Sequence, residues 1–254
     1  MILSFICQVT KVTFFIQNQI IFLQKNYKSN LNFKIWYYAS SKIEHKYNKK
    51  MNKCLIKNSL KKGVSYSTYR TLIKGLLVEG KSTGKEQSED LLNYSKLNHA
   101  RMDRLDKTLQ ISEATRQALN NQTENYSLLV LAEGWCGDAA QVLPVLNKIA
   151  EASPKLDLKL VCRDENDELT NAFLTNDSKS IPKVILINNK NEVVNTWGPR
   201  PSIATKMVQD YKEKHNGLDA EFKKNLQLWY NKDKGLNIQS DIVHLLESAS
   251  VLTV

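Results

Sequence analysis

The stretch that most constrains the fold is Leu128–Pro144, which reads LLVLAEGWCGDAAQVLP. Its first part, Leu128–Ala132, is a run of aliphatic residues that stops at Glu133, as expected of a short buried strand. From Gly137 onward apolar residues recur every three or four positions, which predicts a helix. The stretch therefore predicts a strand, a tight turn and a helix, with the thiol of Cys136 in the first turn of that helix.

The position of Cys136 indicates a reactive thiol. The first backbone N–H groups of a helix have no partners within the helix and carry partial positive charge. A sulfur placed there is stabilised as the thiolate, which is the form that attacks disulfides and other electrophiles. Cys136 is therefore a candidate nucleophile, with the indole of Trp135 beside it.

The net charge of +10 does not require a nucleic-acid partner. Residues 1–50 hold eight lysines and one glutamate, so seven of those charges lie there and only three on the remaining 204 residues. A basic face of the kind that binds nucleic acid is therefore not expected.

The use of cysteine indicates the compartment. The four cysteines, which are Cys7, Cys54, Cys136 and Cys162, form no CxxC and have no metal-ligand spacing with the histidines. Such sparse use is typical of a reducing compartment, so we expect a cytoplasmic protein with no metal and no other cofactor. We interpret Cys7 and Cys54 as incidental thiols.

Residues 1–50 differ in composition from the rest, being dense in Ile, Phe, Asn, Lys and Tyr and lacking Gly, Pro and Asp. One interpretation is that translation begins at Met51 and that the preceding stretch is a doubtful or disordered segment. The other is a targeting segment. Its apolar part, Val12–Leu23, is interrupted by polar residues, is too short and polar to span a bilayer, and is followed by no close cleavage site.

Residues 51–123 are predicted to be a helical N-terminal extension. Serine caps and helical spacing predict three helices, over Ser65–Gly80, Ser88–Leu109 and Ser112–Asn120. The apolar stripe of the second helix is expected to consist of Leu91, Leu92, Tyr94, Leu97, Met102 and Leu105.

Residues 124–217 alternate strands and helices in the order β-α-β-α-β-β-α, which predicts an α/β domain. The expected strands are Ser127–Ala132, Leu156–Cys162, Val184–Asn188 and Glu192–Trp197, and the expected helices Gly137–Ala152, Asp167–Leu174 and Ser202–His215. Residues 218–254 are predicted to be a helical C-terminal extension, with helices over Asp219–Asn231 and Ile238–Glu247. The aromatic pattern of the first of these, from Phe222 to Tyr230, predicts that it docks against the core.

Several residues of the α/β domain resemble those of the thioredoxin family. Trp135-Cys136-Gly137 matches the start of that family's Trp-Cys-Gly-Pro-Cys motif, and Pro144 lies where the family has a helix-kinking proline. Ile181-Pro182 corresponds to the family's cis-proline, which exposes backbone groups to an extended substrate, and Gly198 to a glycine of the same groove. The resemblance covers Tyr126–Asn216 and implies a thioredoxin-like fold. More narrowly, the chain resembles bacterial proteins with a WCGDA-type motif. The first strand of a full thioredoxin is missing or replaced by the preceding helices.

The departures from the family pattern bear on the chemistry. Ala139 stands where a dithiol thioredoxin has its second, resolving cysteine, and Val130 stands where the family has a buried acid. Asp138 replaces a proline and disfavours a neighbouring thiolate. Dithiol disulfide reduction is therefore not expected.

Three functions remain. The first is monothiol thiol–disulfide chemistry by Cys136 on protein or low-molecular-weight substrates, resolved by an external thiol or by Cys162, whose simpler interpretation is a small core residue. Arg200 is expected either to offset Asp138 at the groove rim or, more simply, to be a surface charge. Asp164 is expected to bond the Trp135 indole or to cap the next helix.

The second function is a binding module that holds an extended peptide in the groove of Trp135, Ile181-Pro182 and Gly198 without turnover. The third is an iron–sulfur or glutathione carrier, which the residues after Cys136-Gly137 make the weakest of the three. The pKa of Cys136 separates the first two, because a value well below about 8.5 indicates a nucleophile.

Overall fold

The computed structural model describes residues 52–215 and 217–251. The predictions made for residues 1–50, and that for Cys7, lie outside the described residues. The described residues from Lys53 onward form one compact unit. In the described part of the chain, no helix is both long enough and apolar enough to cross a membrane.

The centre of this unit is a four-stranded mixed sheet. Its strands are β1 (Tyr126–Ala132), β2 (Leu156–Cys162), β3 (Lys183–Asn188) and β4 (Val193–Trp197). They lie in the order β2-β1-β3-β4, with β1 parallel to β2 and antiparallel to β3, and β3 antiparallel to β4. The central strand β1 is buried on both faces, which explains its continuous aliphatic sequence.

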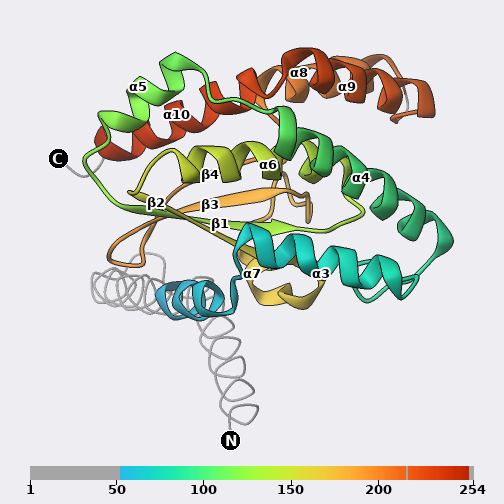
Figure 1. Cartoon of the computed structure of the whole chain (residues 1–254), viewed down its shortest axis with the longest axis horizontal. Coiled ribbons are helices and arrows are strands. Elements are labelled where there is room, and N and C mark those ends of the chain that lie inside the picture. Colours follow the sequence, from blue (N-terminus) through green and yellow to red (C-terminus); the bar gives the residue numbers. More distant parts are fainter. Residues whose placement is uncertain (1–51, 216, 252–254) are drawn as a thin grey trace, which may run out of the picture. The chain divides into compact units, whose positions relative to one another are not determined.

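Helices cover both faces of the sheet. These are α6 (Gly137–Glu151), α7 (Asp167–Ala172) and α8 (Ser202–Lys214), with a 3-10 turn, η1 (Arg163–Glu165), after β2. In Figure 1, α6 lies above the sheet and α7 below it. Together with the strands they give the predicted order β-α-β-α-β-β-α, so the thioredoxin-like fold class is confirmed.

The N-terminal extension is helical, as predicted. A helix over 52–62 is followed by α3 (Tyr66–Val78), α4 (Glu89–Thr108) and α5 (Glu113–Asn120). The side chains of Ser65, Ser88 and Ser112 cap the last three helices, each accepting the backbone N–H three residues on. The predicted starts of these three helices are therefore confirmed.

The predicted apolar stripe of α4 is partly wrong. Met102 and Leu105 are buried, but Tyr94 and Leu97 are 53% and 48% exposed. The buried positions at the other end of the helix are the polar Ser95 and Asn98. They are buried because they bond buried groups of other segments: Ser95 bonds Ser82, and Asn98 bonds the carbonyl of Gly134.

The segment before β1 contributes only one isolated bridge to the sheet within the described residues. Val64 pairs antiparallel with Leu160 at the outer edge of β2, with two backbone hydrogen bonds of 2.9 Å. This agrees with the prediction that helices stand in place of the first strand of a full thioredoxin.

The C-terminal extension consists of α9 (Ala220–Asp233) and α10 (Leu236–Val251). The second helix begins earlier and ends later than predicted, and it packs against β4, α5, α6 and α8 (Figure 1). In α9, Phe222, Leu226 and Tyr230 are buried, so the predicted docking of this helix is confirmed.

Candidate functional site

Cys136 lies at the N-cap of α6, where the sequence placed it. Its Sγ accepts the backbone N–H of Ala139 at 3.4 Å, and thus occupies the position of a capping side chain. Pro144 lies inside the same helix, as predicted. Cys136 as a whole is only 8% exposed.

The segment around Ile181 closes the other side of the thiol. The Sγ of Cys136 donates to the carbonyl oxygen of Ile181 at 3.4 Å, and the Ile181–Pro182 bond is cis, as predicted. Gly198 lies directly against the carbonyl of Pro182 with φ of 110°, so that a Cβ would have no room there. Three of the four predicted groove positions therefore lie together next to the thiol.

Asp138 is buried and both of its carboxylate oxygens have partners. Its Oδ2 forms an ion pair of 2.6 Å with Arg200, and its Oδ1 accepts the Tyr230 hydroxyl at 2.9 Å. The interpretation of Arg200 as an ordinary surface charge is therefore wrong, because its side chain is only 24% exposed and forms an ion pair with a buried acid. Burial raises the pKa of Asp138, while Arg200 and Tyr230 act against that rise.

The thiol of Cys136 is neutral in this conformation. Burial raises its pKa to about 12, and the negative charge of Asp138 raises it as well. The backbone N–H groups of Ala139 and Asp138 and the charge of Arg200 lower it by less. The expected thiolate stabilisation at the helix start is thus present, but desolvation of the sulfur outweighs it.

Trp135 is held by a cation above its ring. The guanidinium of Arg163 lies 4.9 Å from the ring centroid and forms an ion pair of 2.7 Å with Asp164. Asp164 therefore acts on Trp135 through Arg163 and not through the expected bond to the indole. The helix-cap alternative is also wrong, because the N-cap of α7 is Asn166.

Glu133 is a buried acid that the sequence did not single out. It is 1% exposed, its Oε1 accepts the backbone N–H of Asp164 at 2.9 Å, and its Oε2 has no hydrogen-bond partner within the described residues. Burial raises its pKa, against the hydrogen bond from the backbone N–H of Asp164. A buried acid thus lies directly after β1, whereas Val130 fills the position that the family pattern gives to an acid.

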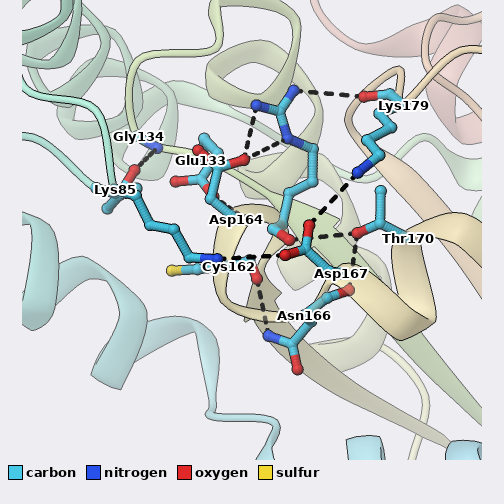
Figure 2. A network of polar contacts seen from close by, with 12 residues as sticks. Lys85, Glu133, Gly134, Cys162, Asp164, Asn166, Asp167, Thr170 and Lys179 are labelled. Atoms are coloured by element: carbon cyan, nitrogen blue, oxygen red, sulfur yellow. Dashed lines mark hydrogen bonds and ion pairs between the residues drawn. The ribbon is translucent and has the colours of Figure 1, made fainter.

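A polar network continues from Glu133 along the loop after β2 (Figure 2). It includes Asn166, which donates to the carbonyl of Cys162 at 2.8 Å, and an exposed acid, Asp167, that pairs with Lys85 and Lys179. Cys162 is 7% exposed, and burial, with Glu133 as the next cause, raises its pKa to about 12. These surroundings favour the interpretation of Cys162 as a small core residue. Its role as a resolving thiol stays a prediction.

Side chains from both extensions bond the segments on either side of Cys136. The hydroxyl of Thr83 accepts the N–H of Gly134 at 2.8 Å, and the amide of Asn98 donates to the carbonyl of Gly134 at 3.0 Å. From the C-terminal side, Gln227 bonds Gln141 at 2.9 Å. A polar residue on the apolar face of a helix, such as Asn98, was the available signal for these contacts.

Comparison with known proteins gave a family match and several solved structures. The match is to the family described as Thioredoxin, over residues 84–212. It starts before α4, and thus upstream of the resemblance noted from Tyr126 onward. No curated protein matches the chain.

Among the solved structures is a protein of unknown function from Pseudomonas aeruginosa, 16% identical over 73% of this chain and 99% of its own, with a TM-score of 0.49. An HIV epitope scaffold is 18% identical over 72% of this chain and 98% of its own, with a TM-score of 0.46. The NTD_N/C domain of alkylhydroperoxide reductase AhpF from Enterococcus faecalis is 19% identical over 46% of this chain and 59% of its own, with a TM-score of 0.31.

The family match spans half of the chain and coincides with the strands and helices that place Cys136 beside the Ile181–Pro182 bond. This protein therefore belongs to the thioredoxin family.

Proposed function

We propose that the protein is a monothiol thiol–disulfide exchange protein that uses Cys136, with its WCGDA-type sequence as a single-cysteine variant of the thioredoxin motif. The observation that carries the proposal is the contact of 3.4 Å between the Cys136 sulfur and the carbonyl of Ile181. A disulfide on an extended segment that pairs with the backbone at Ile181 would bring its sulfur to Cys136.

The chemistry needs one protein thiol and two external ones. Cys136 loses its proton to solvent, and its thiolate attacks one sulfur of a substrate disulfide, which breaks the S–S bond and releases the other sulfur as a thiol. A low-molecular-weight thiol then attacks the mixed disulfide and frees the second substrate thiol. A further molecule of that thiol regenerates Cys136, so two external thiols are oxidised to one disulfide for each substrate disulfide reduced.

The surroundings of Cys136 also supply what a thiolate needs once the sulfur is hydrated. The first N–H groups of α6 and the charge of Arg200 already lower its pKa, and burial is the largest cause that opposes them. The described cysteines, which are Cys54, Cys136 and Cys162, are all free thiols, and this favours work in a reducing compartment such as the cytoplasm.

A second candidate function is a binding module that holds an extended peptide without turnover. It is favoured by the 8% exposure of Cys136 and by a thiol pKa of about 12, because a thiol in that state does not attack. In this alternative Cys136 is a capping residue of α6, and any partner binds beside Ile181 without forming a covalent bond.

Reaction with a small neutral disulfide separates the two functions. The full chain is incubated with 2-hydroxyethyl disulfide at pH 8, and peptides are mapped by mass spectrometry before and after addition of glutathione. We expect an adduct on Cys136 that glutathione removes. The variant Cys136→Ser should lack the Cys136 adduct and keep any adducts on other cysteines. The variant Cys162→Ser should still form the adduct on Cys136.

The binding module makes the opposite prediction. Cys136 would stay unmodified in the folded protein while the exposed Cys54 of the same molecules becomes modified. Cys54 thus serves as an internal control that the reagent was active, and an unmodified Cys136 beside a modified Cys54 contradicts the exchange function.

A further inference from the structure

One face of α9 is directed at the start of α6. Tyr230 donates to Asp138 at 2.9 Å, and Gln227, three residues earlier on α9, accepts from Gln141 at 2.9 Å. Residues three and four apart on a helix share a face, so these contacts come from one side of α9. Asn231, on the same side, accepts from Arg104 of α4 at 2.7 Å.

These contacts lie immediately beside the thiol. A Cβ on Gly137, the residue after Cys136, would be 3.4 Å from the Gln227 amide nitrogen and 3.7 Å from Arg101 of α4. The first turn of α6 is thus enclosed between α9 and α4, and Cys136 is 8% exposed although it lies at a helix terminus.

The polar part of the attachment of α9, beside the buried Phe222 and Leu226, is made by side chains that can exchange their partners for water. Gln227, Tyr230 and Asn231 reach α6 and α4 by hydrogen bonds, and each donor and acceptor can be solvated when the helix moves away. The connections at its two ends turn through residues in the left-handed region, Gly217 with φ of 135° and Lys234 with φ of 55°. Gly235, at the end next to α10, lies against Val145 of α6, and at the other end the Tyr211 hydroxyl of α8 donates to Asp219 at 2.6 Å.

We propose that α9 is a lid over Cys136 and that Tyr230 is the positioning residue that keeps it closed through Asp138. The proposal rests on the proposed function of Cys136 and adds its regulation: the thiol reacts when α9 moves away from the first turn of α6. A substrate or partner that displaces α9 therefore uncovers the nucleophile and the carbonyl of Ile181 together.

The lid explains why the Cys136 thiol is neutral although it lies at a helix start. When α9 is closed, the sulfur is desolvated and neutral. When α9 is open, water reaches the sulfur, and the helix start and Arg200 remain to favour the thiolate. The covered thiol therefore reacts with small oxidants only as often as α9 opens.

The test is the rate at which iodoacetamide alkylates Cys136 and Cys162, followed by peptide mass spectrometry in the full chain. Tyr230→Phe keeps the ring and removes the hydroxyl that bonds a charged group, so we expect Cys136 to react on the order of tenfold faster. Cys162, which ends a paired strand, should react at its wild-type rate. Gln227→Ala removes a second contact of the same helix and should act in the same direction.

Tyr66→Phe is the matched control. It removes another tyrosine hydroxyl that donates to a carboxylate, that of Asp106 at 2.7 Å, between α3 and α4 and outside the contacts of α9. It should leave the Cys136 rate within twofold of wild type. The lid is contradicted if neither Tyr230→Phe nor Gln227→Ala changes the Cys136 rate, or if Cys136 and Cys162 accelerate by the same factor, as general destabilisation would make them do.

The two proposals fail differently. If Tyr230→Phe is alkylated faster at Cys136 but forms no mixed disulfide with 2-hydroxyethyl disulfide, the lid is supported and the exchange function is contradicted. If wild type and Tyr230→Phe form the mixed disulfide at equal rates, the exchange function is supported and the lid is contradicted.

Discussion

Cys136 and Cys162 are two thiols with nearly equal burial and very different surroundings. They are 8% and 7% exposed, and burial raises the pKa of each to about 12. Around Cys136, two backbone N–H groups and Arg200 act against that rise. Around Cys162, the three acids Glu133, Glu165 and Asp164 all add to it.

The difference shows that burial alone does not distinguish a reactive cysteine from a structural one. What distinguishes them is the charge each sulfur would meet after water reaches it. Cys136 would then be next to a helix start and to the Asp138–Arg200 ion pair, in which the guanidinium offsets the acid, whereas Cys162 would be next to three acids. Only the surroundings of Cys136 therefore favour a thiolate once water reaches the sulfur.

The largest expected effect concerns the ion pair on the Cys136 side. Arg200→Met leaves the Asp138 carboxylate buried without its cation, and we expect the free energy of unfolding to fall by about 3 kcal/mol, because removing one partner of a buried pair leaves an uncompensated charge. Urea unfolding followed by circular dichroism measures it.

Two further variants show whether the loss of stability comes from leaving a buried charge unpaired. Lys206→Met, which breaks the exposed pair with Asp210 on α8, should change stability far less. The double variant Asp138→Asn, Arg200→Met should recover part of the loss, since no charge is then left unpaired. Equal losses from Arg200→Met and Lys206→Met would mean that the Asp138 pair is not a buried one.

An intermediate effect is expected on the pH dependence of Cys136. Asp138→Asn removes the acid that raises the pKa of this thiol, so the midpoint of its alkylation rate against pH should move down by about one unit. Asp210→Asn, on an exposed helix face, is the control and should not move it. An unchanged midpoint in Asp138→Asn would show that Asp138 does not act on the sulfur.

The smallest effect concerns the Cys162 side. The pKa of Glu133 is higher in the folded than in the unfolded chain, so the folded state holds its proton more tightly. Stability from this group is full below the ordinary value of about 4.5 and is lost as pH rises from there to the raised value. Glu133→Gln keeps the acceptor for the Asp164 N–H and should remove this loss.

The measurement is the difference in the free energy of unfolding between wild type and Glu133→Gln at several pH values. Taking the difference cancels the other carboxylates, whose pKa values move in both directions. Relative to Glu133→Gln, wild type should become less stable as pH rises. A difference that does not change with pH would mean that Glu133 is ionised as easily in the folded chain as in the unfolded one.

Local sequence signals predicted most of the fold. Serine caps and apolar periodicity gave the starts of α3, α4 and α5, and the aliphatic run before Glu133 gave β1, because each depends on neighbours within a few positions. The turn at Cys136 followed from the strand and helix patterns on either side of it, and the cis bond at Ile181–Pro182 from the family resemblance.

The rest of the site depends on residues far apart in the chain. The partners of Asp138 are Arg200 and Tyr230, the latter 92 positions away, and no local pattern marks such a pair. The helix start at Cys136 correctly indicated a group that lowers the thiol pKa. It gave no measure of the desolvation that raises it, because burial there depends on α4 and α9.

Native-state labelling of the two thiols against urea tests the central claim most directly. The rates of Cys136 and Cys162 are measured with the same neutral reagent at urea concentrations below the unfolding transition. If α9 uncovers Cys136 by local opening, its rate will be nearly independent of urea, while that of Cys162 will rise with the slope of global unfolding. If both thiols show the global slope, Cys136 is reached only in the unfolded chain, and the account of a covered nucleophile is contradicted.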